Sequence, residues 1–180
     1  MTLRLAAAIF LGMLPMARAH GQALDEYQVK AAFLYNFAKF VEWPADAFKN
    51  ARDPILVCVL GHNPFGNALE DAIRGKSIEG RTFAYRHVSD AESASACQIL
   101  FVGWEESKHF RALLENLKPM GILTVGEAQG FATGGGVINF KLDEGRVRFE
   151  INVDAAEHEQ LHISAKLLSL AQIVKSEKLP

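Results

Sequence analysis

The strongest constraint on the fold is a set of three short apolar runs, separated by segments with helical periodicity. PILVCVLG at 54–61, CQILFVG at 97–103 and GILTVGE at 121–127 are of strand length and rich in aliphatic residues. Such continuous runs are typical of strands buried on both faces of a parallel sheet. The segments 63–75 and 105–118 have the apolar spacing of helices. Because parallel strands need crossover connections, this alternation predicts an α/β fold.

The remaining segments add helices and an antiparallel pair. RTFAYRHV at 81–88 alternates like a strand, and GVINFKLDEGRVRFEINV at 136–153 is predicted to be a hairpin that turns at Asp143-Glu144-Gly145. Three further helical segments are predicted: Asp25–Trp43 (stopped by Pro44), a short turn near 154–160, and Ser164–Lys175. We therefore expect a single three-layer α/β sandwich, with a mainly parallel sheet, an antiparallel C-terminal hairpin and helices on both faces.

The first 19 residues have the pattern of a secretory signal peptide. Arg4 precedes an apolar run from Leu5 to Leu14, and Ala17-Arg18-Ala19 provides a small-residue cleavage site. The apolar run is much shorter than the roughly 20 residues that a membrane-spanning helix needs. We expect residues 1–19 to be cleaved, leaving one domain over 20–180 in the periplasm, with no direct insertion into the membrane.

The charge of the mature chain gives no reason to expect an anionic partner. Without Arg4 and Arg18, 17 basic side chains remain against 21 acidic ones, a formal charge of −4. Nucleic acids and anionic membranes are bound mainly by basic surfaces. We therefore expect no nucleic-acid partner.

Cys58 and Cys97 are the only two cysteines. In an exported protein, two cysteines most simply form a disulfide. A reactive thiol pair is the alternative, but the spacing is unlike that of a C-x-x-C redox site. We therefore predict a structural disulfide between Cys58 and Cys97.

The stretch HEQLH at 158–162 matches the H-E-x-x-H motif of zinc metalloproteases. In that motif two histidines share one face of a helix and bind the metal, while the glutamate activates water. Here Ser164 is a predicted N-cap of a new helix, so His158 and His162 need not share one helix. The extended motif also lacks its third histidine, because Leu168 stands at that position. The sequence indicates no catalytic residue, metal or cofactor.

A glycine-rich loop, TVGEAQGFATGGG at 124–136, follows the third apolar run. Clustered glycines either permit tight turns or let a partner approach the backbone closely. Both interpretations stay open for this loop. These residue patterns are more typical of an exported binding or regulatory domain than of an enzyme.

Several segments in order resemble the YfiR family of periplasmic regulators. They are VKAAFLYNFAKFVEWP (29–44), ILVCVLGHNPFG (55–66), CQILFVG (97–103), ILTVGEAQGFATGGGVINF (122–140), RFEINVDAA (148–156) and LHISAKLLSLAQIV (161–174). The resemblance implies a non-enzymatic α/β domain that binds and represses the periplasmic region of a YfiN-type inner-membrane diguanylate cyclase. It also implies release from repression by a YfiB-type, OmpA-like lipoprotein, and we expect a homodimer. Lower cyclic-di-GMP output would link such a repressor to biofilm regulation.

The resemblance also bears on individual residues. Cys58 and Cys97 match the disulfide pair of the family, whereas a second pair found in some relatives is absent, with Ala132 and Asn139 in that region. A partner- or ligand-binding surface is implied at the 127–136 loop, the hairpin end and the turn before the last helix. Its candidate residues are Thr133, Glu150, His158, His162 and Ser164. Two alternative functions remain, a periplasmic small-molecule-binding module and a metal-dependent hydrolase suggested by HEQLH.

Overall fold

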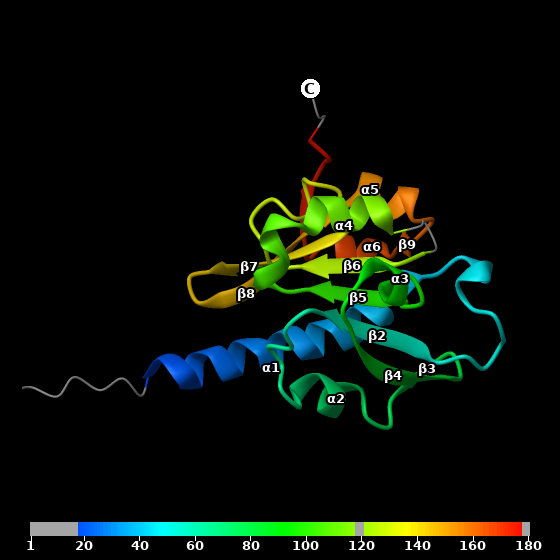
Figure 1. Cartoon of the computed structure of the whole chain (residues 1–180), viewed down its shortest axis with the longest axis horizontal. Helices are drawn as coiled ribbons and strands as arrows, with labels where there is room; N and C mark the ends of the chain where they lie inside the picture. The colour runs from blue at the N-terminus through cyan, green and yellow to red at the C-terminus, as the bar shows by residue number, and fades with distance from the viewer. Residues whose placement is uncertain (1–17, 118–120, 178–180) are drawn as a thin grey trace, which may run out of the picture.

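The computed structural model describes residues 18–117 and 121–177 (Figure 1). The predicted signal peptide at 1–19 lies almost wholly outside the described residues; Arg18 and Ala19 are the exception and belong to the first helix. Within the described ranges, no helix is long and apolar enough to span a bilayer.

A mixed sheet of eight strands in the order β10-β8-β7-β6-β5-β2-β4-β3 forms the centre of the fold. Most neighbouring strands run parallel, and the antiparallel pairs are β7–β8 and β3–β4. The strands are β2 (Ile55–Leu60), β3 (Ser77–Ile78), β4 (Arg81–Val88), β5 (Ile99–Val102), β6 (Leu123–Gly126), β7 (Ile138–Asp143), β8 (Arg146–Asn152) and β10 (Gln172–Val174). The predicted mainly parallel α/β sheet with a C-terminal hairpin is therefore confirmed.

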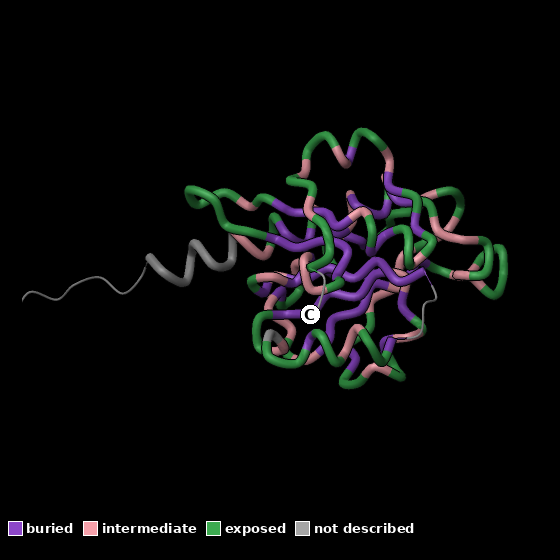
Figure 2. Tube along the Cα trace, turned by 90° about the horizontal axis from the view of Figure 1, so that it is seen from above, coloured by how far each residue is buried: buried purple, intermediate pink, exposed green. Residues whose placement is uncertain are grey.

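Helices cover both faces of this sheet, as predicted. One face packs against α1 (Arg18–Ala38), α2 (Ala68–Ile73), α5 (Val153–His158) and α6 (Ala165–Leu168), and the other against α3 (Ala91–Ala94) and α4 (Phe110–Asn116). Alternating strand residues separate the two cores: Val57 and Val59 face the first, Cys58 and Leu60 the second. Figure 2 shows the buried parts of the chain gathered in the interior, with the exposed parts around them. Burial on both faces explains why the strand sequences are continuously apolar.

The first helix ends earlier than the sequence predicts. It stops at Ala38 rather than Trp43, and the chain then forms strand β1 (Val41–Glu42). This strand pairs antiparallel with β9 (His162–Ile163), making a separate two-stranded sheet. Val41 and Ile163 are both buried, so a tertiary contact that is distant in sequence overrides the local helical periodicity.

The prediction of a final helix over Ser164–Lys175 is wrong for its second half. Ser164 caps α6 as predicted, accepting a hydrogen bond from the Leu167 backbone N–H at 3.3 Å, but the helix stops at Leu168. Gln172–Val174 instead forms β10, which pairs parallel with β8 at the edge of the sheet. The backbone groups of β8 would be unpaired on that side without β10, and the β-branched pair Ile173-Val174 suits a strand.

The hairpin turn follows the predicted chemistry. Glu144 and Gly145 have φ values of +49° and +73°, and both lie between the paired residues Asp143 and Arg146. Two central residues with positive φ are the requirement of a type I′ turn. The turn therefore fixes the register that places Asn139 opposite Glu150.

Cys58 in β2 and Cys97, just before β5, are joined by a disulfide, with their Cα atoms 6.0 Å apart. Both residues are buried in the second core. The bond ties two neighbouring central strands across 39 residues of sequence.

The glycine-rich loop has a packing function. Phe131 is completely buried, and its ring lies directly over the backbones of Gly126 and Gly136. A methyl group at either glycine would overlap the ring. Gly126 and Gly136 therefore serve a close internal contact rather than the approach of a partner.

We expect Gly126→Ala or Gly136→Ala to destabilise the fold by about 1–3 kcal/mol, because the added methyl group would overlap the fully buried Phe131 ring and force it or the backbone to shift. Urea unfolding of the purified variants measures the change. Gly103→Ala is the matched control, since a Cβ there would meet only ordinary contacts of 3.7 Å or more at an ordinary φ. Equal stability of all three variants would contradict this packing account.

Candidate functional site

A cleft of about 740 Å³ opens at the carboxyl ends of β5 and β6, between the helix α1 and the β7–β8 hairpin. Ligands of α/β domains commonly bind beyond the carboxyl ends of parallel strands, where loops diverge. Most of the lining residues are charged, polar or aromatic, and one glycine and one leucine are added to them: Glu26, Tyr27, Lys30, Trp104, Glu127, Gln129, Gly130, Thr133, Asn139, Phe140, Lys141, Leu142, Glu150 and Glu177.

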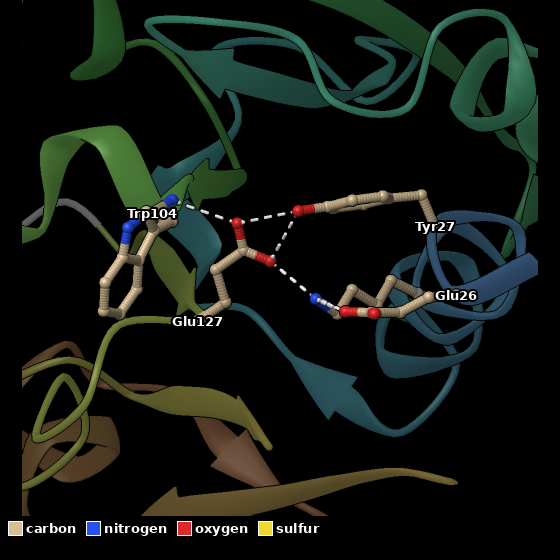
Figure 3. A network of polar contacts seen from close by, with 5 residues as sticks. Glu26, Tyr27, Trp104 and Glu127 are labelled. Atoms are coloured by element: carbon tan, nitrogen blue, oxygen red, sulfur yellow. Dashed lines mark hydrogen bonds and ion pairs between the residues drawn. The ribbon is translucent and has the colours of Figure 1, made fainter. Parts of the chain in front are cut away.

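Glu127, which follows the end of β6, is the centre of the polar network on one wall (Figure 3). Its carboxylate accepts hydrogen bonds from the Tyr27 hydroxyl at 3.1 Å and the Trp104 backbone N–H at 3.0 Å. The Lys30 ammonium donates to the other carboxylate oxygen at 2.6 Å. These bonds join α1 to the carboxyl ends of β5 and β6.

Lys30 is a buried cation held between two carboxylates. Its side chain is only 4% exposed and lies 2.5 Å from Glu26 as well as 2.6 Å from Glu127. The ammonium group also lies 4.6 Å from the centre of the Tyr27 ring. A charge buried to this extent needs such compensation, because removing it from water is costly.

Tyr27 has a strongly raised pKa. Burial of its hydroxyl is the largest cause, followed by the negative charge of Glu127, and both disfavour the phenolate. The folded protein therefore keeps the Tyr27 hydroxyl protonated at pH values where the unfolded chain, with an ordinary pKa of 10.0, begins to lose this proton.

This shift predicts a loss of stability in alkali that depends on Tyr27. Its contribution is fully present below pH 10.0 and declines above that value, because only the unfolded state releases the proton. Tyr27→Phe should therefore be less stable than wild type at pH 8, through loss of the hydrogen bond to Glu127, and should close part of that gap by pH 11. Urea unfolding across this range measures the difference, and a constant gap would contradict the prediction.

The opposite wall carries a second polar group on the hairpin. The Glu150 carboxylate accepts from the Lys141 ammonium at 2.9 Å and from the Asn139 side-chain amide at 3.4 Å. Asn139 is 2% exposed, and its Oδ1 atom has no hydrogen-bond partner among the described residues. A buried amide oxygen without a donor is unusual in a folded protein.

The C-terminal segment closes the cleft at one side. Thr133 donates a hydrogen bond from its hydroxyl to Glu177 at 3.4 Å, and the Glu177 backbone N–H donates to the Thr133 carbonyl at 2.8 Å. Arg111 reaches the same carboxylate at 3.4 Å. Residue 177 therefore connects the glycine-rich loop with α4.

The structure places the predicted site residues at two ends of the sheet. Thr133 and Glu150 line the cleft at the carboxyl ends of β5 and β6. His158, His162 and Ser164 lie at the opposite end, where the neighbouring Glu159 accepts from the backbone of Ile122 immediately before β6. The single surface that the sequence suggested is therefore divided in two.

The HEQLH segment does not have the geometry of a zinc protease. His158 is the last residue of α5, Gln160 has a φ of +56°, and His162 lies in β9. The two histidines therefore do not share a helical face, which the metalloprotease motif requires. Across residues 18–117 and 121–177, no three His, Cys, Asp or Glu side chains form a group suited to a metal ion.

Sequence reasoning did not identify Tyr27, Lys30, Trp104 or Asn139 as cleft residues. A weak signal existed for one of them, because Glu26 and Lys30 have the i, i+4 spacing of a helical ion pair. The contact of Lys30 with Glu127 spans 97 residues and has no local signature.

The fold and the cleft define a small α/β domain with a polar cleft at the carboxyl edge of its sheet. Residues 27–172 match the model of the YfiR/HmsC-like family, and the chain belongs to that family. Membership implies a periplasmic regulator of diguanylate cyclase signalling, in a family of regulators rather than enzymes. No curated protein matches the chain.

A solved structure shares the fold at low sequence identity. A conserved domain protein from Vibrio cholerae has a TM-score of 0.52 at 10% identity, with 82% of this chain and 60% of that chain covered. An ABC domain in complex with L-Trp from Streptococcus pneumonia has a TM-score of 0.49 at 11% identity, with 85% of this chain and 60% of that one covered. The chain thus spans about 60% of the length of these proteins.

Proposed function

We propose that this protein binds the periplasmic region of an inner-membrane diguanylate cyclase of the YfiN type and represses it, lowering cyclic-di-GMP output. The observation that carries the proposal is the family match across residues 27–172, which includes all of the central sheet except part of the edge strand β10. The protein acts after export and cleavage of residues 1–19, as one domain over 20–180. A YfiB-type lipoprotein relieves the repression, and the repressor is a homodimer.

Two surfaces are available for these contacts. His158 and His162 are exposed at the amino end of β6, near the partly buried hydrogen bond from the Ile122 backbone N–H to the Glu159 carboxylate. Thr133 and Glu150 belong to the cleft at the other end of the sheet. Separate surfaces suit a repressor that must engage a cyclase and a releasing lipoprotein.

Cellular cyclic-di-GMP tests the repressor function. Deleting the gene should raise cyclic-di-GMP, and supplying the wild-type protein in the periplasm should restore the lower level. The variants Glu150→Gln, His162→Ala and Ser164→Ala identify the surface that the cyclase uses. A variant at that surface should fail to restore the lower cyclic-di-GMP level, and a variant at the other surface should restore it. Because Ser164 caps α6 and its replacement costs about 1 kcal/mol of stability, protein levels must be compared in parallel.

An unchanged cyclic-di-GMP level after deletion, with the protein normally present in the periplasm, would contradict repression. A second candidate function, a periplasmic small-molecule-binding module, then becomes the better account. The cleft of about 740 Å³ favours it, because this volume is within the range of ligand-binding pockets.

A further inference from the structure

The cleft contains a buried hydrogen-bond acceptor that the described residues leave without a donor. Asn139 is 2% exposed and lines the cleft, and its amide nitrogen donates to Glu150. Its Oδ1 atom accepts no hydrogen bond from any residue within 18–117 and 121–177. Burying an amide oxygen without a donor costs free energy. A ligand N–H or O–H that donates to this oxygen therefore gains more binding free energy than it would by donating to an exposed oxygen.

The charge of the lining favours a cation. Four carboxylates and two ammonium groups line the cleft, a formal charge of −2. Lys30 lies between Glu26 and Glu127, so those two carboxylates share one buried cation. Glu150 differs from them in the exposure of its cationic partner. Its own side chain is 11% exposed, but the side chain of Lys141 is 47% exposed. The Lys141 ammonium can therefore withdraw into water while the Glu150 carboxylate stays in the cleft.

The rim of the cleft supplies apolar surface close to these polar groups. Trp104 is 61% exposed and Leu142 is 58% exposed, and both line the cleft. Large apolar side chains at the rim of a polar cleft can cover the hydrocarbon part of a ligand, and an indole ring also attracts cations.

We propose that this cleft binds a small organic primary amine, whose ammonium group donates a hydrogen bond to Asn139 Oδ1 and replaces Lys141 as the ion-pair partner of Glu150. An ammonium group has three N–H donors, so it can satisfy both acceptors at once. The hydrocarbon chain lies against Trp104 and Leu142. Binding does not depend on repression of a cyclase, so the inference stands apart from the proposed function and is tested on the purified chain.

Isothermal titration of the disulfide-intact protein with putrescine at pH 7.5 and low salt tests the proposal. Putrescine carries two positive charges, equal in size to the formal charge of the lining. We expect saturable binding to one site. Tetramethylammonium carries a positive charge but no N–H donor, so it should bind several-fold more weakly or not at all.

Variants of the site should change the affinity in opposite directions. Glu150→Gln should weaken binding about tenfold or more, and Asn139→Ala about two- to tenfold, from the usual strengths of charged and neutral hydrogen bonds. Lys141→Ala should tighten binding about two- to fivefold, because it removes a competing ion pair of the kind found at surfaces. Glu115→Gln on α4 makes the same charge change on an exposed residue that does not line the cleft, and should leave the affinity unchanged.

Three results would overturn the proposal. One is equal affinity of Glu150→Gln and Glu115→Gln for putrescine. Another is equally tight binding of tetramethylammonium by the wild-type protein, a result that does not depend on any variant folding. The last is tighter binding of a lysine blocked at both its amino and carboxyl ends than of putrescine, which would assign the cleft to a side chain of a protein partner.

Discussion

Removal of the Cys58–Cys97 disulfide should lower the free energy of unfolding by about 4 kcal/mol, from the loop entropy of a cross-link across roughly 40 residues. The Cys58→Ala/Cys97→Ala double variant suits the measurement, because alanine leaves no polar group in the second core, where both cysteines are buried. Urea unfolding of the variant and of the oxidised wild type gives the difference. For a domain of this size, such a loss is a large fraction of the total stability.

Reduced wild-type protein is the control for the disulfide prediction. With both thiols free, it should unfold at nearly the same urea concentration as the double variant, since it lacks the same cross-link. Equal stability of the oxidised and reduced proteins would contradict the view that this bond stabilises the joined strands β2 and β5.

Replacing Lys30 should have an effect of similar size. Lys30→Met removes the buried cation but leaves Glu127, whose side chain is 7% exposed, without its ion-pair partner. Breaking a buried pair in this way typically costs about 3–5 kcal/mol, because the remaining charge stays desolvated. The Lys30→Met/Glu127→Gln double variant should recover part of the loss, since it removes both charges. Urea unfolding of the two variants at pH 7 measures the coupling.

An exposed ion pair provides the matched control for Lys30. Arg74 lies 2.8 Å from Asp71, and their side chains are 72% and 58% exposed. Arg74→Met should therefore cost less than about 1 kcal/mol. Equal losses of unfolding free energy in Lys30→Met and Arg74→Met would contradict the prediction that burial makes the Lys30 ion pair more important for stability.

The sequence predicts the sheet well because its signals are local. The continuous apolar runs become β2, β5 and β6, since each strand is buried on both faces, and the residues Glu144-Gly145 have the conformation that the hairpin requires. Ser164 acts as the predicted N-cap. Each of these features depends on residues that are close together in the sequence, so it can be predicted from the sequence alone.

The errors arise where distant segments decide the conformation. The pairing of Val41 with Ile163 ends the first helix, and the free edge of β8 converts 172–174 into a strand. The predicted site residues are separated in space for the same reason. The predicted Thr133 and His162 lie at different ends of the sheet, and the contact between Lys30 and Glu127 joins residues 97 positions apart.

Capture of the cyclase by this protein tests the central claim most directly. Tagged, disulfide-intact protein starting at His20 is incubated with detergent-solubilised envelope from its own cells, and the eluted proteins are identified by mass spectrometry. The account predicts that a membrane diguanylate cyclase is enriched over the tag alone. Recovery of no cyclase under conditions that keep membrane complexes intact would contradict the claim that the protein represses a cyclase by binding it.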